Sequence, residues 1–164
     1  MFILRATGKL RDRIRASAGY AGEESTTVLG DWYATMLRWR PQVALLVNQR
    51  TLLPVLMPLA PAATMPAQVA DHVGEVLAAH GVPDSVIRAE VDRMRQWRIA
   101  PTANRSVVGV MNEFTFLADA RRNTGNPNLV DLAVRLAATP CSPLYKRRVS
   151  PDRELAALLE QIGA

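Results

Sequence analysis

The segment spanning residues 42–57 constrains the fold more than any other part of this sequence. Residues 43–47 are all apolar, which is typical of a strand that is covered on both faces of a sheet. A polar turn from Asn48 to Thr51 follows, and a second apolar run over residues 52–57 carries Pro54. Proline cannot donate a ladder hydrogen bond, so the second run belongs at an unpaired edge or a bulge. The pattern therefore predicts a β-hairpin with an inner first strand and an outer second strand.

Further strands and several helices are predicted around this hairpin. A first strand is expected over residues 2–7, beside the hairpin, and a short edge strand over residues 97–100. Helices are predicted over residues 9–16, 29–39, 67–80, 83–97, 104–122, 129–138 and 151–162. The predicted fold class is α+β: a small, mostly antiparallel sheet built on a central β-hairpin (about residues 42–57), covered by five to seven helices.

The helix predicted over residues 29–39 rests on large apolar side chains at a 3.6-residue period. They are Leu29, Trp32, Tyr33, Met36 and Leu37. Thr27 is expected to cap this helix. So many large side chains favour a helix in the core, with ligand stacking on Trp32 or Trp39 as the alternative.

Length and composition bound the class of protein. With 49% hydrophobic and 21% charged residues, the 164-residue chain fits a single domain over residues 1–164. The C-terminal helix within residues 151–164 is a candidate for a peripheral position in this domain. No apolar run approaches the ~20 residues that cross a bilayer, and the N-terminus lacks a signal-peptide pattern, so we expect no membrane contact. The single cysteine, Cys141, allows no internal disulfide, and we expect a cytoplasmic protein.

The charge balance is basic, with 20 Lys and Arg residues against 15 Asp and Glu residues. Two clusters form a candidate polyanion patch: Arg11, Arg13 and Arg15, and Lys146, Arg147 and Arg148. The alternative is that both clusters are ordinary solvated surface.

The familiar catalytic and metal-binding patterns do not occur. His72 and His80 are eight residues apart on one predicted helix, too far to share an ion, so no metal site is predicted. Cys141 would need a base brought from elsewhere to act as a nucleophile, and a small core residue is the favoured interpretation. The sequence contains no nucleophile elbow, dinucleotide-binding loop or Walker loop. No cofactor is expected, and the catalytic residues, if any, are unknown.

A polar set remains at the ends of the predicted elements. Its members are Asp31, Asn48, Arg50, Thr51, Asn104, Arg105, Ser106, Asn112 and Glu113. One interpretation is a buried hydrogen-bond network that clamps the hairpin to a helix. The other is an anion or ligand pocket in which Arg50 and Arg105 receive a phosphate or carboxylate.

Three blocks carry a resemblance to a known family. They are LGDWYA at residues 29–34, NxRTLLPV at residues 48–55 and ANRSVxGxMN at residues 103–112. In this order they resemble the signature blocks of a small bacterial family of uncharacterised proteins, and the similarity spans residues 1–145. The resemblance implies one intact bacterial domain and implies no activity or ligand.

Two functional hypotheses follow. The favoured one is a non-enzymatic binding or interaction module that engages RNA, DNA or a partner protein, as in a toxin–antitoxin-type operon. The alternative is a small enzyme acting on a phosphorylated or nucleotide-like substrate. In it, Arg50 and Arg105 clamp the anion, Asn104 or Asn112 orients the substrate, and Asp31 or Glu113 acts as acid or base. A homodimer formed through the proline-bearing strand is a further hypothesis.

Overall fold

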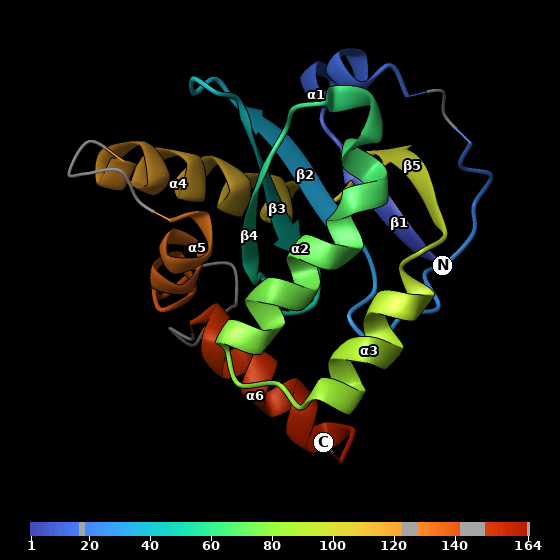
Figure 1. The fold of residues 1–164 in the computed structure, drawn as a ribbon, viewed down its shortest axis with the longest axis vertical. Coiled ribbons are helices and arrows are strands. Elements are labelled where there is room, and N and C mark those ends of the chain that lie inside the picture. Colours follow the sequence, from blue (N-terminus) through green and yellow to red (C-terminus); the bar gives the residue numbers. More distant parts are fainter. Residues whose placement is uncertain (17–18, 123–127, 142–149, 164) are drawn as a thin grey trace.

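A five-stranded sheet organises the computed structural model, which describes residues 1–16, 19–122, 128–141 and 150–163 (Figure 1). In chain order the strands are β1 (Phe2–Ala6), β2 (Trp32–Leu37), β3 (Val43–Asn48), β4 (Pro54–Pro58) and β5 (Trp97–Pro101). Their order in the sheet is β4-β3-β2-β1-β5. Strand β3 pairs antiparallel with β2 and β4, whereas β1 pairs parallel with β2 and β5.

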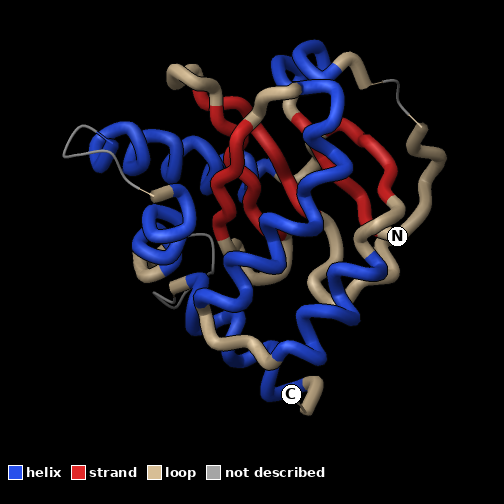
Figure 2. Tube along the Cα trace, in the orientation of Figure 1, coloured by secondary structure: helices blue, strands red, loops and turns tan. Residues whose placement is uncertain are grey.

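Helices cover the sheet on both faces, as the tube in Figure 2 shows. They are α1 (Gly8–Ile14), a 3-10 turn η1 (Ala62–Thr64), α2 (Met65–Ala79), α3 (Asp84–Arg93), α4 (Arg105–Arg122), α5 (Leu129–Ala137) and α6 (Pro151–Gln161). One core cluster joins the sheet to α1 and α2, and α3 packs against it; the other joins the sheet to α4. Helix α5 lies against β4 and contributes to both clusters. None of the helices within the described residues is long and apolar enough to span a membrane.

The predicted hairpin and the α+β fold class are confirmed. Strand β3 is buried along its whole length, and β4 is the edge strand of the sheet, with Pro54 at its first position. The hairpin forms one side of the sheet, so its antiparallel pairing extends from β4 to β2, and the parallel pairing lies beyond it. The central strand is β2.

The helix predicted over residues 29–39 is wrong, because this segment contains strand β2. Both faces of β2 are covered: Trp32 and Ala34 belong to one core cluster, and Tyr33 and Leu37 to the other. A strand buried on both faces is apolar at nearly every position, so its residues also fit a 3.6-residue period. Thr27 caps no helix; its hydroxyl accepts a hydrogen bond from Gly30 N in the loop before β2.

The remaining elements match their predicted positions closely. Strand β1 forms as expected, although β2 separates it from the hairpin. Strand β5 is the second edge of the sheet, as predicted for residues 97–100. Helix α3 ends at Arg93 rather than at Trp97, because the chain must turn there to enter β5.

Candidate functional site

The turn between β3 and β4 is fastened by Asn48, whose side chain is fully buried. Its Nδ2 donates to Leu29 O at 2.8 Å and to Asp31 O at 3.3 Å. Its Oδ1 accepts from Arg50 N, Thr51 N and Thr51 Oγ1 at 3.0–3.1 Å. An asparagine side chain that bonds backbone groups two and three residues ahead is a common way to build a tight turn. Asn48 therefore holds both its own turn and the loop that leads into β2.

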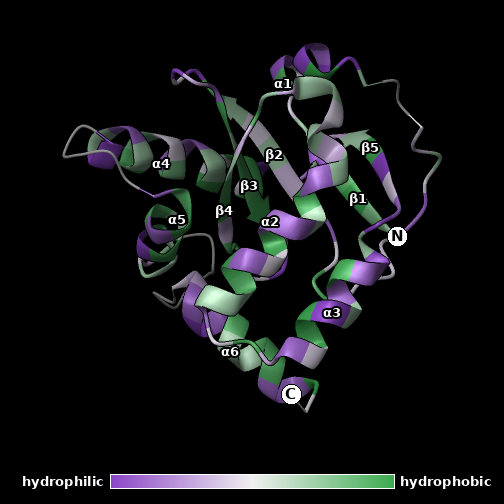
Figure 3. Ribbon diagram, in the orientation of Figure 1, coloured by the Kyte–Doolittle hydropathy of each residue, from purple (hydrophilic) through white to green (hydrophobic). Residues whose placement is uncertain are grey.

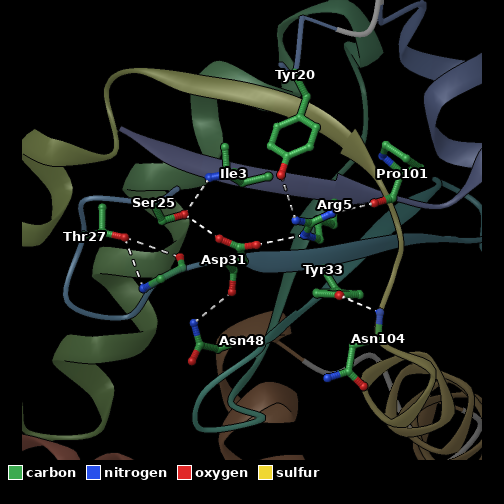
Figure 4. A network of polar contacts seen from close by, with 11 residues as sticks. Ile3, Arg5, Tyr20, Ser25, Thr27, Asp31, Tyr33, Asn48, Pro101 and Asn104 are labelled. Atoms are coloured by element: carbon green, nitrogen blue, oxygen red, sulfur yellow. Dashed lines mark hydrogen bonds and ion pairs between the residues drawn. The ribbon is translucent and has the colours of Figure 1, made fainter. Parts of the chain in front are cut away.

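A second set of polar contacts surrounds Arg5 of β1 (Figure 4). Arg5 Nε donates to Asp31 Oδ2 at 2.8 Å, and the other carboxylate oxygen of Asp31 accepts from the Ser25 hydroxyl at 2.6 Å. The same guanidinium donates to Pro101 O and to the Tyr20 hydroxyl, and it lies 5.2 Å from the centre of the Tyr20 ring. Arg5 and Asp31 are each only about one-sixth exposed, at 16% and 17%. The pair ties β1 to the segment between α1 and β2.

A polar cleft with a volume of about 500 Å³ is lined by Arg5, Tyr20, Ser25 and Asp31, and Arg50 borders it from the hairpin turn. Arg50 donates through Nη1 to Val28 O, and its side chain passes close to Gly30. Each guanidinium that borders the cleft is thus already bonded to a protein group. These contacts favour the interpretation of Asn48, Thr51 and Asp31 as a structural network. The network joins the hairpin turn to the loop at residues 27–31, whereas the sequence predicted that it joins the hairpin to a helix.

The other predicted residues lie at α4 and do not line this cleft. Asn104 precedes α4; its Oδ1 accepts from Ser106 N and Val107 N, as expected for a helix-capping residue, and its backbone N donates to the Tyr33 hydroxyl at 2.8 Å. Because Tyr33 is the strand partner of Arg5, Asn104 remains close to the network around Arg5. Three further predicted residues, Arg105, Asn112 and Glu113, are exposed on α4. The predicted set is thus divided: Asp31 and Arg50 line the cleft, Asn48 and Thr51 are buried in the turn, and the others lie at α4.

A group of arginines from three separate elements forms what we call the basic rim, namely Arg13, Arg38, Arg40 and Arg122. Arg13 of α1 donates through Nε to Gln42 Oε1, which joins α1 to the loop between β2 and β3. The ribbon in Figure 3 is coloured as hydrophilic over parts of α1, of this loop and of the C-terminal end of α4.

The centre of the rim is Trp39, which is 7% exposed. Its Nε1 donates to Asp119 Oδ1 at 2.6 Å, and the Arg122 guanidinium lies 5.0 Å from the ring centre. Hollows of about 330 and 610 Å³ flank this tryptophan, and Arg38 lines both. The arginine–tryptophan–arginine run at residues 38–40, at the end of the helix predicted over residues 29–39, is the sequence signal that could indicate this surface.

The predicted polyanion patch is only partly within the described residues. Arg11 and Arg13 belong to α1, and Arg15 follows it in a left-handed conformation, with φ of 53°. Arg13 and Arg15 are exposed, whereas Arg11 is half-buried. The second cluster, Lys146, Arg147 and Arg148, lies outside the described residues.

The described residues contain no group of three or more His, Cys, Asp or Glu side chains that would hold a metal ion. Cys141 is buried in the core cluster beneath α4. Burial, followed by the nearby charge of Glu113, raises the pKa of the Cys141 thiol to about 11. A thiol with so high a pKa is a poor nucleophile at neutral pH.

Together, the mixed sheet, the buried asparagine turn and the arginine-rich surface define an α+β domain without a recognisable catalytic constellation in its described part. The chain belongs to the family described as "Domain of unknown function (DUF6933)", which matches residues 3–154. No curated protein and no solved structure shows a significant match to the chain.

Proposed function

We propose that this protein binds a polyanion, with nucleic acid as the favoured class, through the basic rim. The observation that carries the proposal is that Arg38, Arg40 and Arg122 line the two hollows beside Trp39. Arg13 of α1 adds a fourth guanidinium group through its bond to Gln42 of the same loop. Arginine pairs well with phosphate because its planar fork matches two phosphate oxygens. Surfaces of this kind supply most of the affinity for nucleic acid backbones.

The charges of the rim are not neutralised within the described residues. The ion pairs found there join Arg5 to Asp31, Arg95 to Asp71 and Arg98 to Glu23, away from the rim. Asp119 is the carboxylate nearest to Trp39, and it accepts the indole N–H. Arg38 and Arg122 share one hollow with this single carboxylate, and Arg40 lines the other hollow, so positive charge exceeds negative charge around Trp39 and favours an external anion as the partner.

Binding to a fluorescent 20-nucleotide RNA and to a DNA duplex, measured by anisotropy over a salt series, tests the proposal. If all four arginines contact phosphates of the duplex, the slope of log K against log salt is about −3.6, because each contact contributes about −0.9. The double variant Arg38→Glu/Arg40→Glu should reduce this slope by about 2 and weaken binding at least tenfold at low salt.

A matched control carries the same change of net charge elsewhere. Arg88 of α3 and Arg153 of α6 are both exposed and lie outside the rim. The variant Arg88→Glu/Arg153→Glu should retain the affinity of the wild type. Equal losses in the two variants would mean that net charge alone governs binding, and undetectable binding by the wild type at low salt would remove the proposal.

The polar cleft favours a second candidate, an enzyme acting on a phosphorylated or nucleotide-like substrate. Its volume of about 500 Å³ lies within the range of small-molecule sites, and it brings Asp31 together with the guanidinium groups of Arg5 and Arg50. Turnover of nucleoside monophosphates followed by phosphorus NMR tests it. Product formation that disappears in Arg50→Gln, in a variant of unchanged stability, would support the enzyme; no turnover of any such ester would count against it.

A further inference from the structure

A separate hollow of about 330 Å³, which we call the chamber, lies between α2, α3 and α6. Its walls are aliphatic: Leu77 comes from α2, Val86 from α3, and Leu155 and Leu158 from α6. This volume lies at the lower end of the range for small-molecule sites, and such sites are mostly apolar with a few polar groups that orient the ligand. The chamber is distinct from the polar cleft and from the basic rim.

Three polar residues line the chamber, namely Ser85, Glu90 and Arg93, and Glu90 is the one that is buried. Within α3, all of whose residues are described, Glu90 alone is fully buried, with 3% of its surface exposed. One carboxylate oxygen accepts from Val28 N at 2.9 Å and the other from Leu29 N at 2.7 Å. A carboxylate has about four acceptor positions, so about two remain for another donor.

The negative charge of Glu90 is poorly solvated, so a further hydrogen-bond donor beside the carboxylate would stabilise it. Burial raises the pKa of Glu90, with the two backbone hydrogen bonds opposing the rise. A buried charge gains more from an opposite charge than an exposed one does, because water and salt screen the exposed charge. Arg93 also lines the chamber, but it is exposed. The positive charge of Arg93 opposes the rise in the pKa of Glu90, but water and salt screen an exposed charge more than a buried one, so we expect the carboxylate to select the head group of a ligand.

The apolar face of α6 is left partly uncovered at the chamber. Leu158 and Leu159 are half-buried, and Ile162 is 44% exposed. An aliphatic chain placed against these residues would bury apolar surface that water now contacts, at about 25 cal/mol for each Å². Apolar walls with an anionic group inside match an amphiphile with a cationic head.

We propose that the chamber binds a small aliphatic amine, with its alkyl chain against α6 and its ammonium group hydrogen-bonded to Glu90. The proposal does not depend on polyanion binding, because none of the rim residues lines the chamber. It predicts a ranking among ligands that share one chain: octylamine binds more tightly than octanol, and octanol more tightly than octanoate.

The test is calorimetric titration of the full chain with these three compounds, each below its critical micelle concentration, with methyl NMR to locate the site. We expect octylamine to bind at least tenfold more tightly than octanoate, a difference of about 1.4 kcal/mol, and to shift the leucine and valine methyl resonances of the chamber. The variant Leu158→Trp fills the chamber with a larger side chain and should weaken octylamine binding at least tenfold. A matched control, Ala120→Trp on the exposed face of α4, should leave it unchanged.

A further variant separates the head group from the chain. Glu90→Gln keeps the size of the side chain but removes its charge, so the preference for octylamine over octanol should disappear while octanol binding persists. Absence of octylamine binding at millimolar concentration, tighter binding of octanoate than octylamine, or equal octylamine affinities in Leu158→Trp and the wild type would each overturn the proposal. Because Leu158 is half-buried, the last outcome is accessible even if Glu90→Gln does not fold.

Discussion

Replacing Asn48 with alanine should destabilise the fold more than most single substitutions. The side chain donates two hydrogen bonds and accepts three, and the residue is fully buried. Each protein hydrogen bond contributes about 1 kcal/mol net, and a buried group left without a partner costs about 1–3 kcal/mol. The 3.3 Å contact to Asp31 O is weak, and Arg50 lies at the exposed end of the turn, where water can replace the lost acceptor. We therefore expect Asn48→Ala to lower the free energy of unfolding by about 3–4 kcal/mol.

Urea denaturation followed by circular dichroism measures this loss. With an m-value of about 2 kcal/mol per molar urea, the midpoint should fall by about 1.5–2 M. Gln49→Ala is the matched control, because this neighbouring side chain is exposed and its backbone N–H, which donates to Asp31 O, is retained. That variant should differ from the wild type by less than about 0.5 kcal/mol.

The variant Asn48→Asp distinguishes lost hydrogen bonds from lost volume. It keeps the size and the acceptors of the side chain, but a carboxylate oxygen replaces the Nδ2 that donates to Leu29 O. Two acceptors then face each other in a buried site, so the loss should be at least as large as that of alanine. A loss below about 1 kcal/mol for both variants, at unchanged m-value, would refute the assignment of Asn48 as the fastening residue of the turn.

Further predictions concern titration, thiol reactivity and backbone strain. The folded-state pKa of Glu90 is raised above its unfolded value of about 4.5. The contribution of Glu90 to stability is therefore greatest below pH 4.5 and falls as the pH rises through the folded-state pKa. Urea titrations across this pH range should show the wild type losing stability relative to Glu90→Gln. The Cys141 thiol, with its pKa raised to about 11, should react with a disulfide reagent at pH 8 far more slowly in the native protein than in urea, as the absorbance of the released thiolate would show. Gly30 has φ of 73°, and a Cβ there would lie 3.5 Å from Arg50 Cδ, so thermal unfolding of Gly30→Ala should show a loss of about 1 kcal/mol.

The elements that sequence predicts well are those with one buried face. Helix α2 and the two helices that follow β5 each carry an apolar stripe at helical spacing, and each forms within a few residues of its predicted range. The hairpin was equally clear, because a proline within an apolar run indicates an outer strand, and Pro54 begins the edge strand β4.

Strand β2 was missed because its environment, rather than its own pattern, determines its conformation. Its sequence includes a tryptophan, a tyrosine and a β-branched threonine, all of which are common in strands. Apolar residues on both faces concealed the alternation that identifies a half-buried strand. The presence of α1 on one side and α4 on the other makes both faces of this strand interior.

The candidate sites were only partly predictable for a related reason. Sequence analysis identified Asp31, Asn48 and Arg50, which indeed lie near one another. It did not identify the roles of Arg5 and Ser25, which complete the network from strand β1 and from the segment before β2. The rim likewise joins residues from α1, the β2–β3 loop and α4, and no spacing along the chain reports that these elements meet.

The three sequence blocks that carry the family resemblance meet in space, and their contacts bear on where ligands bind. Asn48 of the second block bonds the backbone of the first block at Leu29 and Asp31, and the backbone N–H of Asn104 in the third block donates to the Tyr33 hydroxyl of the first. Side chains from β1, α3 and the hairpin turn all fasten the same short segment, residues 28–31. The Asn48 side chain, which makes five hydrogen bonds in this way, has no capacity left for a ligand. Ligand binding is therefore better sought at the arginines of the rim and at the remaining acceptor positions of Glu90, where the described contacts leave capacity unused.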